Sequence, residues 1–288
     1  MAVFLRFYSR ALGLAGMLLL AASMAHDPRW LTERYGILIV LLGSALMRVY
    51  QIPLTKYGAL NLLAVPAVAG AVAIGAPATA LGVYVGVIFA DAAVLRKPVE
   101  SAWINGGREV VALLAAFGMY ALAARLTGAG GATLTANNLP PLALLLFAYF
   151  VISRALLYFT LIFRDKLLEE EKSLILRYEV IGFGTGAIAV SIIIITISEL
   201  GPSGWVVVGI LLALGGLLVR RILEEAVAAE ELNKILAMEQ VVSSDVGLDD
   251  AFRRIEALAH RLVDWRSFSI YRLQGDRLAL VWNQAMGY

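Results

Sequence analysis

The chain has 288 residues, of which 60% are hydrophobic and 16% are charged, and its formal net charge is +2. Soluble domains are about 45–50% apolar and about 25% charged, so this composition, with its long apolar blocks, predicts a polytopic helical membrane protein. The small net charge and the grouping of cations at helix ends argue against a nucleic-acid partner. The chain has no cysteine and only two histidines, which excludes thiolate chemistry and argues against a metal site, so we expect no cofactor.

Several apolar segments have the length of a membrane-spanning helix. About 20 apolar residues cross a bilayer, within a range of about 17–25. We therefore predict an all-α bundle of about eight transmembrane helices. The predicted spans lie near residues 5–25, 36–52, 58–75, 76–95, 104–126, 139–163, 179–199 and 203–219. Only Gly75-Ala76-Pro77 separates the third segment from the fourth, which predicts a tight helical hairpin.

The first segment has two interpretations. Arg6 and Arg10 precede its apolar run, and Ser23 and Ala25 are small residues at positions typical of a signal-peptide cleavage site. The segment is therefore either a retained first span or a cleavable signal peptide. Cleavage would remove one span and leave the orientation of the others unchanged.

The cations are distributed unequally between the two sides of the predicted bundle. With the N-terminus inside, most lysines and arginines fall in inside segments, for example Arg96, Lys97 and Arg221. An excess of lysine and arginine marks the cytoplasmic side of a membrane protein. We therefore predict a multi-pass protein, embedded in the lipid bilayer, with its C-terminus in the cytoplasm.

Residues 89–110, FADAAVLRKPVESAWINGGREV, form the turn between the fourth and fifth predicted spans. Three polar residues of this stretch, Asp91, Asn105 and Arg108, lie close to the membrane boundary. Ionisable groups at membrane depth usually face the interior of a bundle and mark functional sites. The sequence leaves two interpretations: an ion pair between Asp91 and a nearby cation that locks the turn, or an intramembrane site that contacts a small ligand.

Three further polar residues lie inside predicted spans. Arg154 is in the middle of LFAYFVISRALLYFTLIF, so it needs a charged partner or a water-filled cavity. Arg48 lies late in its span, and we expect its side chain to reach the inner membrane surface. We interpret Asn61 as a hydrogen-bonding group between helices, with a ligand contact as the alternative.

The segment that follows the last span, residues 220–242, has good helix formers and neither glycine nor proline. One stripe of this helix resembles a heptad seam, which is weak because it includes alanine, asparagine and glutamine. The helix is either a marginal coiled coil suited to signalling, with a homodimer as its expected state, or a solvated linker. The stripe consists of Ile222, Ala226, Ala229, Asn233, Leu236 and Gln240.

Residues 243–288 have the pattern of a small α/β unit. Asp249 is a candidate N-cap for the helix DDAFRRIEALAHRLVD, whose apolar residues recur at helical spacing. The stretches SFSIYRL and RLALVW alternate in polarity on either side of Gln274-Gly275-Asp276, which predicts a β-hairpin. Two strands are marginal alone, so we expect an incomplete domain.

This order of helix, strand, turn and strand, together with the pattern LDDAFRRI, resembles the start of a GAF domain. The resemblance covers about the last 45 residues and implies the truncated beginning of an α/β GAF domain. It divides the chain into a membrane domain at 1–219, a signalling helix at 220–242 and a partial GAF domain at 243–288.

The membrane part resembles the multi-span MASE-type sensor domains of bacterial signalling proteins. The stretch FADAAVLRKPVESAWINGGREVVALLAA carries the resemblance: an acidic residue, a basic turn and a helix start with an asparagine, Asn105. In many relatives an amide stands where this chain has Arg108. The resemblance implies a sensory role in the bacterial inner membrane and an output domain for cyclic-di-GMP turnover or histidine kinase activity.

Three function classes remain in competition. The leading expectation is a sensory input module that relays a membrane or small-ligand signal through the cytoplasmic helix to the GAF unit and a missing output domain. The alternative is a membrane transporter or substrate-binding component, with Asp91, Asn105 and Arg154 along its path. A membrane-embedded enzyme is disfavoured because no nucleophile–base pair or metal constellation is evident, so we expect no enzyme activity in this chain.

Overall fold

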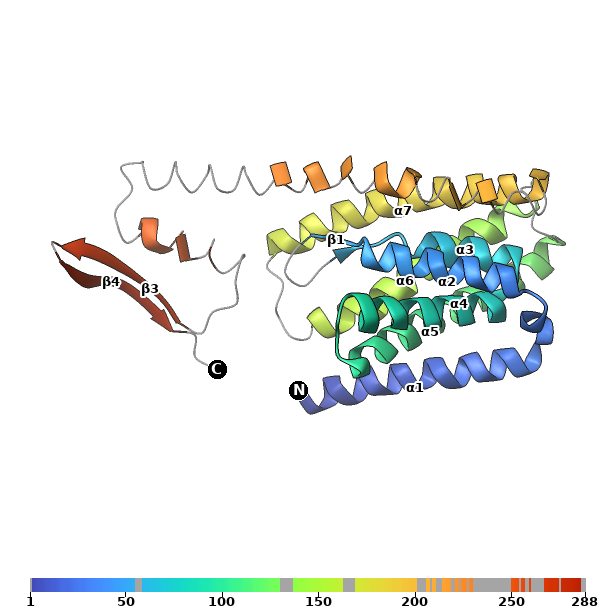
Figure 1. The fold of residues 1–288 in the computed structure, drawn as a ribbon, viewed down its shortest axis with the longest axis horizontal. Coiled ribbons are helices and arrows are strands. Elements are labelled where there is room, and N and C mark those ends of the chain that lie inside the picture. The colour runs from blue at the N-terminus through green and yellow to red at the C-terminus, as the bar shows by residue number, and fades with distance from the viewer. Residues whose placement is uncertain are drawn as a thin grey trace. The chain divides into compact units, whose positions relative to one another are not determined.

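The computed structural model divides into two compact units (Figure 1), the first made of Met1–Ile52 and Ala59–Arg220 and the second of Pro53–Gly58 and Arg221–Tyr288. The structure describes the following residues: 2–54, 59–129, 137–162, 169–200, 206–207, 209–210, 214–218, 221–222, 224–226, 228–229, 250–253, 255–256, 259, 267–274 and 276–285.

The first unit is a helical bundle whose long helices lie side by side (Figure 1). Two short strands, β1 (Ile52–Pro53) and β2 (Ala59–Leu60), pair with each other. The helices are α1 (Ala2–His26), η1 (Pro28–Leu31), α2 (Arg34–Val49), α3 (Ala64–Ala73), α4 (Ala76–Phe89), η2 (Ala90–Val94), α5 (Val99–Thr127), α6 (Leu139–Ile162) and α7 (Glu169–Leu200).

Glycine and proline set several helix boundaries, as the sequence predicts. Gly75 has a φ of +87°, which favours glycine, and Pro77 lies in the first turn of α4, where its missing N–H costs nothing. The predicted tight hairpin between α3 and α4 is thus confirmed. Pro98 precedes α5, and Gly128, with a φ of +64°, ends it in the left-handed conformation common at helix C-termini.

Five helices of the described residues are long and apolar enough to cross a membrane. This confirms a mostly helical membrane bundle, and the count of eight spans stays a prediction. The five are Phe4–His26, Ala76–Val94, Val99–Thr127, Leu139–Phe159 and Lys172–Leu200.

The structure differs from the predicted continuous span at residues 58–75. Strand β2 occupies Ala59–Leu60, and α3 has only 10 residues. At about 1.5 Å of rise per residue, α3 covers about half of a hydrocarbon core that is about 30 Å thick. Asn61 explains part of the difference, because its side-chain oxygen accepts a hydrogen bond from the Leu63 backbone N–H (3.3 Å) and so holds a local turn where a helix was predicted.

The first unit exposes large apolar side chains and buries several charged ones beside its apolar core, which is unusual for a soluble domain. Large apolar side chains such as Phe7, Leu126 and Ile188 are exposed, whereas the carboxylates of Asp91 and Glu109 are buried. Soluble proteins almost never bury charged residues unless they are paired, and they keep exposed apolar patches small. The arrangement fits a bundle whose outer face meets lipid.

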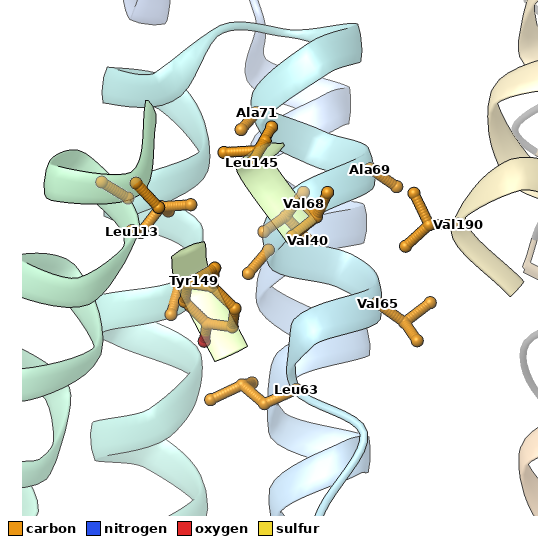
Figure 2. Packing of buried hydrophobic residues seen from close by; sticks show 14 of the residues in the cluster. Val40, Leu63, Val65, Val68, Ala69, Ala71, Leu113, Leu145, Tyr149 and Val190 are labelled. Carbon is orange, nitrogen blue, oxygen red and sulfur yellow. The ribbon is translucent and has the colours of Figure 1, made fainter. Parts of the chain in front are cut away.

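The apolar core lies between α2, α3, α4, α5, α6 and α7. Figure 2 shows Val40, Val68 and Leu145 close together at its centre, and on one side Ala69 of α3 faces Val190 of α7. The ring of Tyr149 belongs to this core and is drawn between Leu145 and Leu63 in Figure 2.

The second unit contains the predicted β-hairpin. Strands β3 (Ser267–Gln274) and β4 (Arg277–Ala285) pair antiparallel, with an irregularity between Ile270 and Tyr271. The described residues between 250 and 259 are helical, and the ring of Phe252 lies 6.2 Å from that of Trp282 in β4. The predicted order of helix and hairpin is confirmed, while the GAF assignment stays a prediction.

Candidate functional site: a buried charged layer

Charged side chains from five helices and one turn meet inside the first unit. We call this set the charged layer. It brings together the C-terminal end of α2, the segment η2 that follows α4, the N-terminal parts of α5 and α7, and the later part of α6. Its charged members are Arg48, Asp91, Lys97, Arg108, Glu109, Arg154 and Glu179.

The first cluster of the layer surrounds Asp91, whose side chain is fully buried. Arg48 at the end of α2 donates from Nε to Oδ1 (3.0 Å) and from Nη2 to Oδ2 (2.9 Å) of Asp91. Lys97 donates from Nζ to Oδ1 (2.8 Å). Asn105 in α5 donates from Nδ2 to Oδ2 (2.6 Å). Both carboxylate oxygens therefore have two donors each, and the carboxylate links α2, the turn and α5.

The backbone around Asp91 is unusual. The segment η2 is a π-helix, and the Leu95 N–H donates to the Ala90 carbonyl where it ends (2.9 Å). The Lys97 N–H then donates to the Asp91 carbonyl (2.8 Å). Between them Arg96 has a φ of +53°, a conformation that costs a non-glycine residue about 1–3 kcal/mol. Single π-turns of this kind are frequent at functional sites, and here the π-turn carries the buried carboxylate.

The second cluster surrounds Glu109 in α5, which is also buried. Arg108 donates from Nη2 to Oε1 (3.0 Å). The Tyr149 hydroxyl and the Ser153 hydroxyl, both from α6, donate to Oε2 at 2.9 and 3.1 Å. Glu109 thereby connects α5 to α6.

The third cluster surrounds Glu179 in α7. Arg154 donates from Nε to Oε2 (2.7 Å), and the Tyr158 hydroxyl donates to Oε1 (2.8 Å). The guanidinium of Arg154 also reaches the backbone carbonyl of Asn61 (3.5 Å) and lies over the ring of Phe150, 5.8 Å from its centroid. The cluster connects α6 to α7 and to the start of α3.

Lys97 lies outside the membrane-spanning helices, at the edge of the layer. Burial, followed by the positive charge of Arg48, lowers the pKa of Lys97, and the hydrogen bond and charge of Asp91 oppose this shift. Asp27, which follows α1, is a second titratable group outside the spans, and hydrogen bonds from Arg29 lower the pKa of its carboxyl group. Lys97, in the turn next to Asp91, is therefore repelled by Arg48 of α2 and Arg108 of α5.

The predicted site residues do not form one ligand-facing group. Asp91 and Asn105 bind each other, Arg108 pairs with Glu109, and Arg154 has the charged partner that its depth requires. Asn61 accepts a hydrogen bond from Arg154 of α6 through its backbone carbonyl, while its side-chain oxygen holds a local turn. A contact between its side chain and another helix stays a prediction.

Arg48 also differs from expectation. Its side chain is buried against Asp91 and does not extend to the membrane surface, because a buried carboxylate with unfilled acceptor positions is a better partner than the interface. Of the predicted signalling stripe, Ile222 is exposed and Ala226 and Ala229 are helical. Asn233 and Leu236 lie outside the described residues.

Sequence reasoning missed five members of the layer. The signal for two of them was present, since Glu109 and Glu179 are ionisable residues inside the predicted spans 104–126 and 179–199, as Arg154 is inside 139–163. The hydroxyl groups carried no such signal, because serine and tyrosine are common in membrane helices. The missed residues are Glu109, Tyr149, Ser153, Tyr158 and Glu179.

The chemistry of the layer is that of ion pairs and hydrogen bonds between helices. Among the described residues no group of three histidine, cysteine or acidic side chains could hold a metal ion. Its carboxylates are occupied by arginine, lysine, asparagine, tyrosine and serine donors. Comparisons with models of known protein families, with curated proteins and with solved structures find no match to this chain.

Proposed function

We propose that the chain is the sensory input part of a bacterial inner-membrane signalling protein. In this proposal the bundle takes up a signal from the membrane or from a small ligand, and the helix at 220–242 passes it to a GAF-like unit and an output domain beyond it. The observation that carries the proposal is the way in which α7, the last helix of the bundle that the structure describes as a continuous element, is attached.

Helix α7 is joined to α6 by side chains and to α3 by close backbone packing. The backbones of α3 and α7 approach closely, and the contacts that the structure describes between α6 and α7 are made by side chains. The link to α6 consists of Glu179 with Arg154 and Tyr158, and of the rings of Phe150 and Phe183, 5.0 Å apart. Long side chains can hold two helices at more than one separation, so this joint can have two arrangements of similar energy.

A second contact connects the layer to the segment that follows α7. The described residues 214–218 are helical, and a Cβ placed on Gly216 would lie 3.2 Å from Cε of Met47 in α2. Met47 directly precedes Arg48, which binds Asp91. A rearrangement of the first cluster would thus move Met47 and change its contact with residues 214–218, which follow α7.

The test uses the absence of native cysteine, which allows spin labels at chosen positions. Spin-labelled cysteines replace Val151 of α6 and Ile188 of α7, which are both exposed. The distance between the two labels is measured by double electron–electron resonance spectroscopy in nanodiscs. Glu179→Gln should change the distance distribution between α6 and α7, because it removes the charge that Arg154 binds. The matched control is Glu199→Gln, an exposed residue of the same helix. An unchanged distribution in Glu179→Gln would contradict the relay.

The same background tests the expected homodimer. A single label at Ile222, which is exposed, reports a distance only if a second copy is near. The proposal expects a defined intermolecular distance at low protein density in the nanodisc. A signal without such a distance would leave the helix as a solvated linker.

The alternative function is a membrane transporter or substrate-binding component, and the buried charged layer is the observation that favours it. The carboxylates of the layer are occupied by protein donors, so a transport path through them needs the ion pairs to open. Flux of labelled solutes into proteoliposomes, lost in Arg154→Ala and Asp91→Asn, would favour the transporter over the relay.

A further inference from the structure

One cation of the charged layer is incompletely bound. Arg108 is 8% exposed, and of its guanidinium nitrogens Nη2 donates to Glu109. Its Nε is buried and has no hydrogen-bond partner, one of three such side-chain atoms among the described residues. A buried donor without a partner costs about 1–3 kcal/mol, and more when the group is charged.

The charged layer also has an excess of positive charge near Arg108. The layer contains the cations Arg48, Lys97, Arg108 and Arg154 and the carboxylates Asp91, Glu109 and Glu179, so it has one more positive charge than negative. The positive charges of Arg48 and Arg108 both act on Lys97. The excess charge is therefore at the Arg48, Lys97 and Arg108 end of the layer.

A phosphate-type oxyanion would satisfy both features. The guanidinium presents N–H groups in a planar fork that matches phosphate oxygens, and an ammonium offers three donors, of which Lys97 gives one to Asp91. The side chain of Lys97 is 31% exposed, so it can receive an anion from outside the bundle.

We propose that the Arg108 and Lys97 end of the charged layer binds one phosphate group, either the headgroup of an anionic phospholipid or free phosphate. This inference rests on the proposed function in one respect, because it names the ligand class that the sensory bundle would detect. Phosphate binding and the relay are measured in separate experiments. An unchanged label distance in Glu179→Gln would contradict the relay and not the phosphate site, and an absence of phosphate binding would contradict the site and not the relay.

The lipid arm uses the full chain in nanodiscs of phosphatidylcholine with increasing phosphatidylglycerol, and native mass spectrometry counts retained lipids. The proposal expects one phosphatidylglycerol to be retained per chain by the unmodified protein. Arg108→Gln should weaken this retention about tenfold or more, because it removes a charge-assisted hydrogen bond. The matched control, Arg125→Gln, changes an exposed arginine at the other end of α5 and should retain the lipid.

The phosphate arm titrates inorganic phosphate, against equal chloride concentrations, into the protein in pure phosphatidylcholine nanodiscs. A rise in unfolding temperature with phosphate that Arg108→Gln abolishes assigns the site to free phosphate, whereas retention of the lipid alone assigns it to the headgroup. If Arg108→Gln does not fold, two other measurements test the site: lipid retention by Lys97→Gln, and the preference of the unmodified protein for phosphatidylglycerol over phosphatidylcholine. Equal retention of both lipids together with no response to phosphate would overturn the site.

Discussion

At the scale of single residues, the defining feature is a carboxylate at membrane depth that has a full set of donors. A buried ion pair is weak evidence for stability in itself, because removing two charges from water costs several kcal/mol per ion. Asp91 offsets this cost with two donors from Arg48 and one each from Lys97 and Asn105. The arrangement favours the interpretation in which Asp91 locks the turn between α4 and α5.

The first prediction concerns the loss of this charge. Asp91→Asn leaves Arg48 and Lys97 facing a neutral amide, and breaking a buried pair costs about 3–5 kcal/mol of unfolding free energy. The same substitution at Asp27 alters a surface pair with Arg29 and should cost far less, since surface pairs contribute about 0–1 kcal/mol and asparagine still caps a helix. Thermal unfolding in detergent compares the two. Equal unfolding temperatures would show that the buried carboxylate is dispensable.

The second prediction concerns pH. Burial and the charge of Arg48 lower the pKa of Lys97 from its ordinary value of 10.5. The unfolded chain then binds more protons than the folded chain in the interval below pH 10.5, so the contribution of Lys97 to stability increases as the pH rises through that interval. The unfolding temperature of the unmodified protein, measured relative to Lys97→Met, should rise with pH toward 10.5. A difference that is flat or that falls would contradict the assigned shift.

At the scale of elements, glycine decides how closely the helices approach. In α4, Gly82 and Gly86 face α2, and a Cβ placed on Gly86 would lie 2.5 Å from the Leu41 carbonyl oxygen and 3.0 Å from the Cβ of Ser44. Small residues four apart allow the backbones of membrane helices to approach, where van der Waals packing replaces the hydrophobic effect. This contact positions the end of α2, and therefore Arg48, beside Asp91.

The third prediction follows from this contact. Gly86→Val should separate α2 from α4 and destabilise the bundle by about 1–3 kcal/mol, the usual cost of overpacking. Gly118→Val is the matched control, because a Cβ at Gly118 meets nothing within 4 Å. Thermal unfolding of both variants in the same detergent measures the difference. If the two variants unfold alike, the close approach of α2 and α4 does not limit stability.

At the scale of the whole molecule, the first unit buries paired charges beside an apolar core and exposes large apolar side chains. The exposed apolar side chains belong largely to the five long apolar helices, and the buried charges belong to the three carboxylate clusters. Within this bundle α5 has 29 residues, which at about 1.5 Å per residue exceeds a hydrocarbon core of about 30 Å. Its two ends should therefore emerge on opposite sides of the membrane.

The fourth prediction tests this orientation. Single cysteines at Arg96, before α5, and at Gly128, after it, are placed in the cysteine-free chain. A membrane-impermeant maleimide should label the cysteine at 128 in intact cells and the cysteine at 96 only after the membrane is opened, because arginine and lysine favour the cytoplasmic side. Labelling of both positions from the same side would show that α5 does not span the membrane.

What the sequence by itself determined about this protein depends on local signals. Composition and apolar blocks predicted a helical membrane bundle, Gly75 and Pro77 predicted the turn before α4, and alternating polarity predicted the hairpin of β3 and β4. Each of these signals depends on residues close together in the chain, where backbone preferences and periodicity act directly.

Only the tertiary structure decided which polar side chains meet. Arg48 and Asp91 are 43 residues apart, and Tyr149 and Glu109 are 40 apart, so no spacing in the sequence joins them. The packing of α2 on α4 and of α5 on α6 brings them together, and burial then requires each charge to find a partner. For this reason Asp91 could be recognised as a buried acid from the sequence, whereas its partner Arg48 could not.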